Sequence, residues 1–385
     1  MSLSPTDFIK AAHNAASHYG FETVEQLKKD PACKECIVTL PHTVTGTNKR
    51  VDDRAGLLCS GVATFCEANL HAMERPTLLY SVEQTPRTGE PAITFHIFNV
   101  EKSIAEALLI QVSRTLASDL GYHDHTVRIN SLGDKDSTAR YTREITNFLK
   151  KRMDAMSPTA REMMKEHPLS ALRQLVNEQH DLGYSSPNPL EFLSDQSRKH
   201  FREIIEYLDM SETPYEIDPK MLGHHECYSD ALFSIDINDE DAPITIHGGR
   251  FDEFAHRNTR TKIPAVGAVV TLKNTKTPAR LPRHKSATPS VYVVHLGFGP
   301  KIRSLMLIDE LRKVGIPVMH DLANDSLSAQ LRDAEKKNVA YTIIVGQKEF
   351  VENSLILRDM HARNQETIDT DSVIKKLKRK KSILA

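Results

Sequence analysis

The residues best suited to phosphate chemistry lie between positions 243 and 274. An apolar stretch there ends in a Gly-Gly-Arg turn at Arg250, and a basic loop leads into a second apolar run that stops at Lys273. A guanidinium can bind a phosphate through two parallel hydrogen bonds, whereas a lysine ammonium acts as a point charge. The alternative for Arg250 is a structural ion pair with Asp252 or another neighbour, and the pattern favours that alternative.

Five cysteines are the next residues with distinctive chemistry. An odd number of cysteines in a chain of intracellular character argues against a disulfide framework. Cys33 and Cys36 have the spacing of two thiolates that share a tetrahedral zinc, but such a site needs two further ligands. Cys59 and Cys66 do not repeat that spacing, and His42 is the remaining candidate. We therefore expect no metal site.

Basic residues gather in two segments that could contact phosphates. Residues 275–289 combine prolines with lysines and arginines and contain no acid, which is typical of a linker, and residues 375–381 read KKLKRKK. The alternative for both segments is a solvated charged surface. Clustered positive charge would support RNA contact by the tail and by nearby bases of the C-terminal region, and both interpretations stay open. The RNA-binding candidates are Arg358, Arg363, Lys375, Lys376, Lys378, Arg379, Lys380 and Lys381.

The overall composition excludes several classes of protein. The chain has 385 residues, with 50 Lys and Arg against 51 Asp and Glu, which is typical neither of a nucleic-acid coat nor of a membrane-surface protein. The N-terminus lacks the basic and apolar regions of a signal peptide, and no apolar run reaches the roughly 18 residues of a spanning helix. We expect a cytoplasmic protein without membrane contact.

The elements that must position these residues change in kind along the chain. Residues 8–21 carry an apolar helical face, with Thr6 or Asp7 as the expected N-cap. Residues 76–101 read as a β-hairpin, residues 137–211 as amphipathic helices, and strand patterns resume after that. This order predicts a mainly antiparallel sheet that is interrupted by a helical insertion.

Beyond residue 290 short strands and helices alternate, which predicts a compact α/β domain of roughly a hundred residues. The whole chain is therefore expected to be of mixed α/β class. The predicted divisions are a core of residues 1–136 and 212–274, a helical insertion of 137–211, a linker of 275–289 and a C-terminal domain of 290–385.

Five strings along the chain resemble histidyl-tRNA synthetases, which are class II aminoacyl-tRNA synthetases. They are INSLGD at 129–134, PYEIDP at 214–219, GGRFDEF at 248–254, PAVGAVV at 264–270 and the C-terminal series that runs from VYVVHL to NQET. The resemblance covers nearly the whole chain. It implies a class II core, an insertion that approaches the tRNA acceptor arm and a C-terminal anticodon-binding domain.

The same resemblance implies that catalytic cations are missing. Class II synthetases use one arginine in a hairpin motif and another near the end of the last apolar strand of the core. This chain has Ser81 at the first position and Lys273 near the second. Amino-acid activation on ATP needs positioned cations at the phosphates. The catalytic candidates that remain are Arg87 in the hairpin loop, Glu101 and Lys273.

The histidine pocket implied by the family is also altered. FHIFNVE resembles the family's His-Gln-Phe-x-x-Glu strand, with Ile97 in place of the glutamine, and MLGHHECY resembles its Arg-Gly-Leu-Asp-Tyr-Tyr segment, with Gly223 in place of the arginine. The glutamate that binds the substrate's amino group in the family has no counterpart in the segment RAGLLCSG of this chain. The remnants of the substrate pocket are Glu83, His96, Glu101, Tyr228 and Arg250.

Three functions follow from these patterns. The leading hypothesis is a degenerate paralogue that has lost amino-acid activation, needs no cofactor and retains binding of tRNA or another RNA, or a regulatory role. The second is an active histidine-tRNA ligase that uses ATP and Mg²⁺, with cations such as Arg87, His224, His225 and Lys273 rearranged. The third is a regulatory subunit that acts through protein partners, as does the synthetase-like partner of ATP phosphoribosyltransferase. A homodimer is a further expectation from the resemblance, although YGFETVEQL lacks the Thr-Pro of the dimer-forming motif.

Overall fold

The computed structural model describes residues 3–24, 53–68, 75–85, 88–224, 227–239, 241–259, 261–274, 290–322 and 324–384. The contacts divide the chain into two compact units, Met1–Ile9 with Thr23–Arg280 and Lys10–Glu22 with Leu281–Ala385. The sequence-based division placed residues 10–22 in the core, whereas the structure groups them with the C-terminal unit. Local periodicity identified this helix but carried no information about its packing partner.

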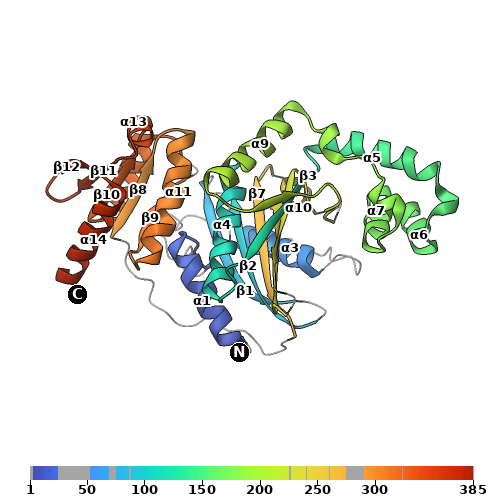
Figure 1. The fold of residues 1–385 in the computed structure, drawn as a ribbon, viewed down its shortest axis with the longest axis horizontal. Coiled ribbons are helices and arrows are strands. Elements are labelled where there is room, and N and C mark those ends of the chain that lie inside the picture. The colour runs from blue at the N-terminus through green and yellow to red at the C-terminus, as the bar shows by residue number, and fades with distance from the viewer. Residues whose placement is uncertain are drawn as a thin grey trace. The chain divides into compact units, whose positions relative to one another are not determined.

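The first unit is built on a seven-stranded sheet with the strand order β1-β2-β7-β6-β5-β3-β4 (Figure 1). Its paired neighbours are antiparallel, except that β3 and β4 are parallel. The predicted mainly antiparallel sheet is therefore confirmed. The strands are β1 (Thr77–Gln84), β2 (Pro91–Phe98), β3 (His125–Ser131), β4 (Tyr215–Ile217), β5 (Ala231–Ile237), β6 (Ile244–Arg250) and β7 (Ala265–Leu272).

The strand register assigns each side chain of this sheet to one face. Ser81 pairs with Thr94, and His96 lies between Leu79 and Gly267 in neighbouring strands, so these residues share one face. The row of Ile97, Val266 and Arg250 is offset by one residue from His96 and lies on the opposite face. Helix α3 (Asp53–Glu67) packs on the His96 face.

Helix α4 (Ile104–Asp119) covers the Arg250 face of the sheet. The apolar stripe that the sequence predicts for this segment, Ile104, Leu108, Val112 and Leu116, is buried in full. An acidic residue, Glu106, lies inside the same buried surface. Helix α10 (Asp252–Thr259) follows β6 and packs against α3 and β7.

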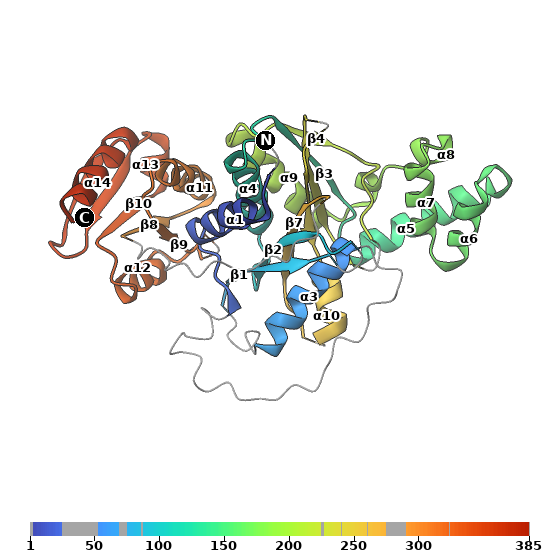
Figure 2. The same ribbon diagram turned by 90° about the horizontal axis from the view of Figure 1, so that it is seen from below.

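Between β3 and β4 the described chain forms helices only, which confirms the predicted helical insertion (Figures 1 and 2). Serine or aspartate caps begin three of them, because Asp134, Ser157 and Ser194 each accept a backbone N–H of the first turn. The elements are α5 (Lys135–Lys150), a 3₁₀ turn (Met153–Ala155), α6 (Pro158–Glu166), α7 (Pro168–Asn177), α8 (Asp181–Tyr184), a second 3₁₀ turn (Pro189–Phe192) and α9 (Asp195–Met210).

The second unit contains a five-stranded sheet with the order β12-β11-β10-β8-β9. Strands β8, β9 and β10 are parallel, and β11 and β12 extend the sheet in antiparallel fashion, so the predicted α/β domain is confirmed. Its elements are β8 (Val291–His295), α11 (Phe298–Lys313), β9 (Val318–His320), α12 (Leu327–Lys336), β10 (Tyr341–Val345), α13 (Gln347–Val351), β11 (Leu355–Asp359), β12 (Asn364–Ile368) and α14 (Thr370–Leu384).

The N-terminal helix α1 (Pro5–His18) begins two or three residues earlier than the predicted cap at Thr6 or Asp7 implied. The cap is Ser4, whose Oγ accepts the backbone N–H of Asp7 at 3.1 Å, so the predicted cap at Thr6 or Asp7 was wrong. Pro5 occupies the first helical position, where its fixed φ angle suits the helix and its missing N–H costs nothing.

Candidate functional site

The position at which the resemblance implies a hairpin arginine, Ser81, lies among hydroxyl and carboxyl groups. Ser81 Oγ lies 2.7 Å from Glu83 Oε1 and 2.6 Å from Thr94 Oγ1, and Thr94 Oγ1 lies 3.3 Å from the same Glu83 oxygen. None of these three side chains carries positive charge. A phosphate brought to this point of the sheet would meet a carboxylate instead of a guanidinium.

His96 lies in a closely packed core on the same face of the sheet. Its side chain is fully buried, its ring stacks on Phe98, and both ring nitrogens lack a hydrogen-bond partner within the described part of the chain. A Cβ atom built at Gly61 of α3 would lie 2.1 Å from Nε2, and one at Gly267 of β7 would lie 2.9 Å from Nδ1. The two glycines therefore let a helix and a strand close on the ring, and burial lowers the pKa of His96 to about 3.

This packing predicts the effect of adding one methyl group at position 61. Gly61→Ala should lower the free energy of unfolding by about 1–3 kcal/mol, because the new Cβ and the His96 ring cannot keep their present positions. Urea unfolding of the variant measures the effect. Combining it with His96→Ala should restore part of the loss, since the smaller side chain makes room. A single variant as stable as the parent would show that the ring is not confined.

Arg250 belongs to a buried ion pair on the opposite face of the sheet. Its Nε and Nη2 atoms donate to the two carboxylate oxygens of Glu106 at 2.7 and 2.9 Å. Its Nη1 donates to the Val100 carbonyl at 3.2 Å and lies 3.3 Å from Asp252 Oδ2. The structural ion pair that the sequence favoured for Arg250 is present, with Glu106 as the partner at shortest distance. Arg250 and His96 cannot line one pocket, because they point to opposite faces.

The buried network continues into α9. His200 Nε2 lies 2.8 Å from Glu106 Oε1, and Glu106 raises the pKa of His200 although burial opposes its charge. Burial likewise opposes ionisation of Glu106, but Arg250 and His200 hold its pKa down at about 2. Sequence reasoning missed Glu106 and His200. The signal was an acid inside the mostly apolar run IAEALLIQV.

The other predicted pocket residues differ in exposure and in partners. Glu101 is exposed and pairs with Lys262 at 3.1 Å. Lys273 is exposed directly after β7, and Tyr228 is half-buried against Gly223 and Gly249. Arg87, His225 and the pair Cys33 and Cys36 lie outside the described residues.

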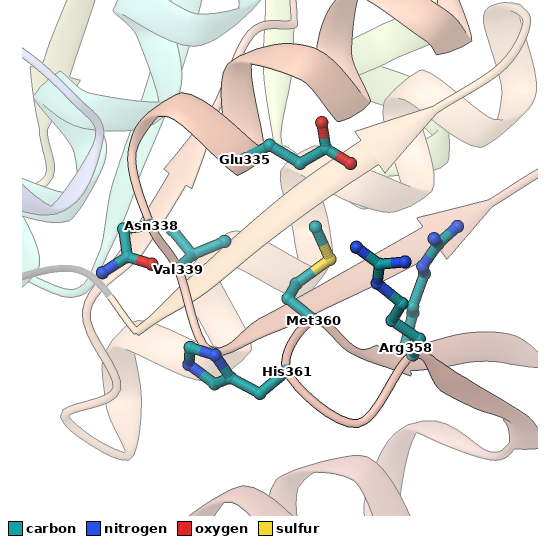
Figure 3. Close-up of a pocket in the computed structure, with 7 residues that line it drawn as sticks. Glu335, Asn338, Val339, Arg358, Met360 and His361 are labelled. Atoms are coloured by element: carbon teal, nitrogen blue, oxygen red, sulfur yellow. The ribbon is translucent and has the colours of Figure 1, made fainter.

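The C-terminal unit has a cavity of about 460 Å³ beside the turn that joins β11 and β12 (Figure 3). Arg358 reaches it from β11 and Arg363 from the turn, where this residue has a φ of 55°. Neither guanidinium has a carboxylate within ion-pair distance among the described residues. The lining residues are Glu335, Asn338, Val339, Arg358, Met360, His361 and Arg363.

The basic tail is the helix α14. Val373 and Leu377 are buried, which leaves Lys375, Lys378 and Arg379 exposed at the intervening positions. Lys376 forms an ion pair with Glu366 of β12. The side chains of Lys380 and Lys381 lie outside the described set. The tail therefore presents positive charge from one ordered element in the same unit as the cavity.

Metal-binding clusters and membrane-spanning helices are both lacking among the described residues. No group of three or more His, Cys, Asp or Glu side chains there is placed to hold a metal ion. None of the described helices combines the length and apolar character needed to cross a membrane. Cys66 is half-buried and Cys227 is buried.

Comparison with known proteins identifies relatives of both units. The family model of the anticodon binding domain matches residues 291–380. The chain is 26% identical over 330 residues to the histidine-tRNA ligase of Caldanaerobacter subterraneus, covering 82% of this chain and 79% of that protein. It is 27% identical over 334 residues to the ligase of Thermoanaerobacter pseudethanolicus, again covering 82% and 79%.

Solved structures were compared as well. The apo histidyl-tRNA synthetase of S. aureus aligns over 97% of both chains with 17% identity and a TM-score of 0.48. An ATP phosphoribosyltransferase regulatory subunit/histidyl-tRNA synthetase from Bacillus halodurans aligns over 89% of this chain and 94% of that chain, with 13% identity and a TM-score of 0.43. The sequence matches show that most of the chain is similar to histidine-tRNA ligases and that residues 291–380 match an anticodon binding domain.

Proposed function

We propose that this relative of the histidyl-tRNA synthetases binds RNA through its C-terminal unit and does not activate histidine. The observation that carries the proposal is a contrast between two sites. The hairpin position for a catalytic arginine holds the hydrogen-bonded Ser81, Glu83 and Thr94. In the unit that contains the match to the anticodon binding domain, two arginines that have no ion-pair partner among the described residues line one cavity.

The argument against activation is electrostatic. Amino-acid activation places extra negative charge on a phosphorus centre, and preorganised cations must be aimed at it. Glu83 supplies a carboxylate near that position, and Arg250 is held on the opposite face by Glu106. Losing one preorganised donor typically lowers a rate by about 10²–10³, so the combined changes favour an inactive centre. On this proposal the protein needs neither ATP nor Mg²⁺.

The argument for RNA rests on the groups around the C-terminal cavity. Sequence-specific proteins recognise unstacked RNA bases by stacking and by hydrogen bonds to base edges, while arginines contact phosphates or stack on base planes. Figure 3 shows Met360 between Glu335 on one side and His361 on the other. Apolar surface, polar edges and two guanidinium groups are thus combined in a space of about 460 Å³. A single-stranded segment of tRNA or another RNA fits this chemistry.

The proposal is tested by two assays on one preparation of the full chain. We expect no histidine-dependent exchange between ATP and pyrophosphate, together with salt-sensitive binding of bulk tRNA. Exchange above background would instead support the rearranged ligase, and Lys273→Ala would then be the first variant to assay. The absence of both exchange and tRNA binding would favour a regulatory role through protein partners. The homodimer and the cytoplasmic location stay predictions of the sequence.

If the two cavity arginines bind RNA, replacing them should weaken RNA binding, and a matched control variant should not. Arg358→Gln combined with Arg363→Gln should weaken tRNA binding by at least about tenfold and reduce the slope of log affinity against log salt by about 1–2. Arg332→Gln is the control, because Arg332 is exposed in the same unit and does not line the cavity. Filter binding or fluorescence anisotropy at several salt concentrations measures both quantities. Equal affinities for all three proteins would remove the cavity from the RNA-binding surface.

A further inference from the structure

Hydrogen bonds that involve two histidines join the end of the N-terminal helix to α11 and β9 of the C-terminal unit. His18 Nε2 lies 2.9 Å from the Ile308 carbonyl of α11, and His320 Nε2 of β9 lies 3.0 Å from the Tyr19 carbonyl. The Tyr19 hydroxyl donates to Asp309 at 3.0 Å. Residues 10–22 belong to this unit, and both ribbon views show the end of α1 near β9 (Figures 1 and 2).

The packing around these bonds is tight. Tyr19 is fully buried and Phe21 is 2% exposed, so the segment contributes apolar surface as well as polar contacts. Two residues after the end of the helix, Gly20 has a φ of 78°, and a Cβ atom at that position would lie 3.7 Å from His320 Nε2. A left-handed glycine lets the chain turn directly above the imidazole.

The bonding pattern fixes how each ring responds to a proton. A carbonyl can only accept, so each Nε2 donates its hydrogen, and a neutral ring then keeps a lone pair at Nδ1. The Nδ1 atom of His320 is buried and has no hydrogen-bond partner in the described residues. Protonation there would create a buried charge and a donor without an acceptor, which is costly in a folded protein.

The charged groups that face the two rings do not offset the free-energy cost of protonating them. Arg312 and Asp309 of α11 act on His18 with opposite sign, and Asp309 is also paired with Lys313 at 2.8 Å. The rings that face His320 are those of His18 from α1 and His295 from β8, and both disfavour its protonation. Burial is the main cause that lowers the pKa of His18 and of His320 to about 4.

We propose that His18 and His320 form a proton-operated latch that holds residues 10–22 on the C-terminal unit at neutral pH and releases them in acid. The sign follows from linkage. Each ring binds a proton near pH 6.5 when released and only near pH 4 when docked, so docking weakens as the pH falls from 6.5 towards 4. At pH 5.5 each histidine should make docking about tenfold less favourable, and the two together about a hundredfold.

Hydrogen exchange of the full chain, read by mass spectrometry between pH 7 and pH 5 and corrected for intrinsic exchange, tests the latch. We expect peptides from residues 5–22 to lose at least about tenfold in protection at pH 5.5, while peptides from β8 and β10 keep theirs. His18→Gln with His320→Gln retains a donor at each position but cannot titrate, so its protection should not depend on pH. His123→Gln is the control, since His123 is exposed in the first unit.

Three results would overturn the latch. Protection of residues 5–22 that does not change with pH would show that the rings do not control docking. Simultaneous loss in β8 and β10 would mean unfolding of the whole unit instead of local release. An unaltered pH response in the double variant would assign the effect to other groups. The wild-type series alone decides the first two points, so the test stands even if the double variant fails to fold.

Discussion

Replacing Glu106 by glutamine should lower the free energy of unfolding by about 3–5 kcal/mol. The substitution removes the charge partner of Arg250, which is 2% exposed and cannot turn to solvent. Asp252 lies 3.3 Å from Nη1 and compensates only part of this charge. A loss of this size is a large fraction of the roughly 5–15 kcal/mol that stabilises a folded domain. Urea unfolding followed by circular dichroism measures it.

Two further variants separate burial of the charge from ion pairing in general. Glu101→Gln removes the partner of Lys262, but both side chains of that pair are mostly exposed, so little change is expected. Arg250→Met with Glu106→Leu removes both buried charges and should recover much of the stability lost by Glu106→Gln. A Glu106→Gln protein within about 1 kcal/mol of the parent would contradict the assignment of Arg250 to a structural ion pair.

Acidification from pH 7 to pH 5 should lower the stability of the first unit by about 2 kcal/mol through His96 alone. Burial lowers the pKa of this ring to about 3, whereas an unfolded chain protonates it near pH 6.5. The unfolded state therefore binds more protons below pH 6.5, and the contribution of His96 is complete above that pH and lost as the pH falls towards 3. Glu106, with a pKa of about 2, does not titrate in this window.

The His96→Leu variant isolates this contribution. Leucine has a similar volume and no titrating group, so the variant should lose less stability than the parent between pH 7 and pH 5. It should also be more stable at pH 7, since two buried ring nitrogens without partners in the described residues are removed. Subtracting the two pH series cancels the opposite effect of His200, whose raised pKa stabilises the folded state at low pH. Parallel curves for the two proteins would contradict the role given to His96, and His123→Leu serves as the control for an exposed histidine.

The order and type of the elements followed from the sequence because they depend on local periodicity. The apolar stripes of α4 and α11 and the hairpin of β1 and β2 are patterns that recur within a few residues. The sequence also showed that arginine is absent at Ser81 and that Arg358 and Arg363 lie in the C-terminal region. Residue identities such as these need no tertiary information.

Tertiary structure alone decided which of these residues meet. Arg250 and Glu106 are 144 residues apart, and their pairing depends on the strand register. A shift of one residue in that register would move the Arg250 side chain to the other face of the sheet. The cavity at Arg358 depends on the end of α12 lying beside the β11–β12 turn. The docking of Tyr19 on Asp309 joins residues separated by 290 positions. Contacts between distant segments are fixed by the packing of the whole chain, and a single sequence records the side chains but not that packing.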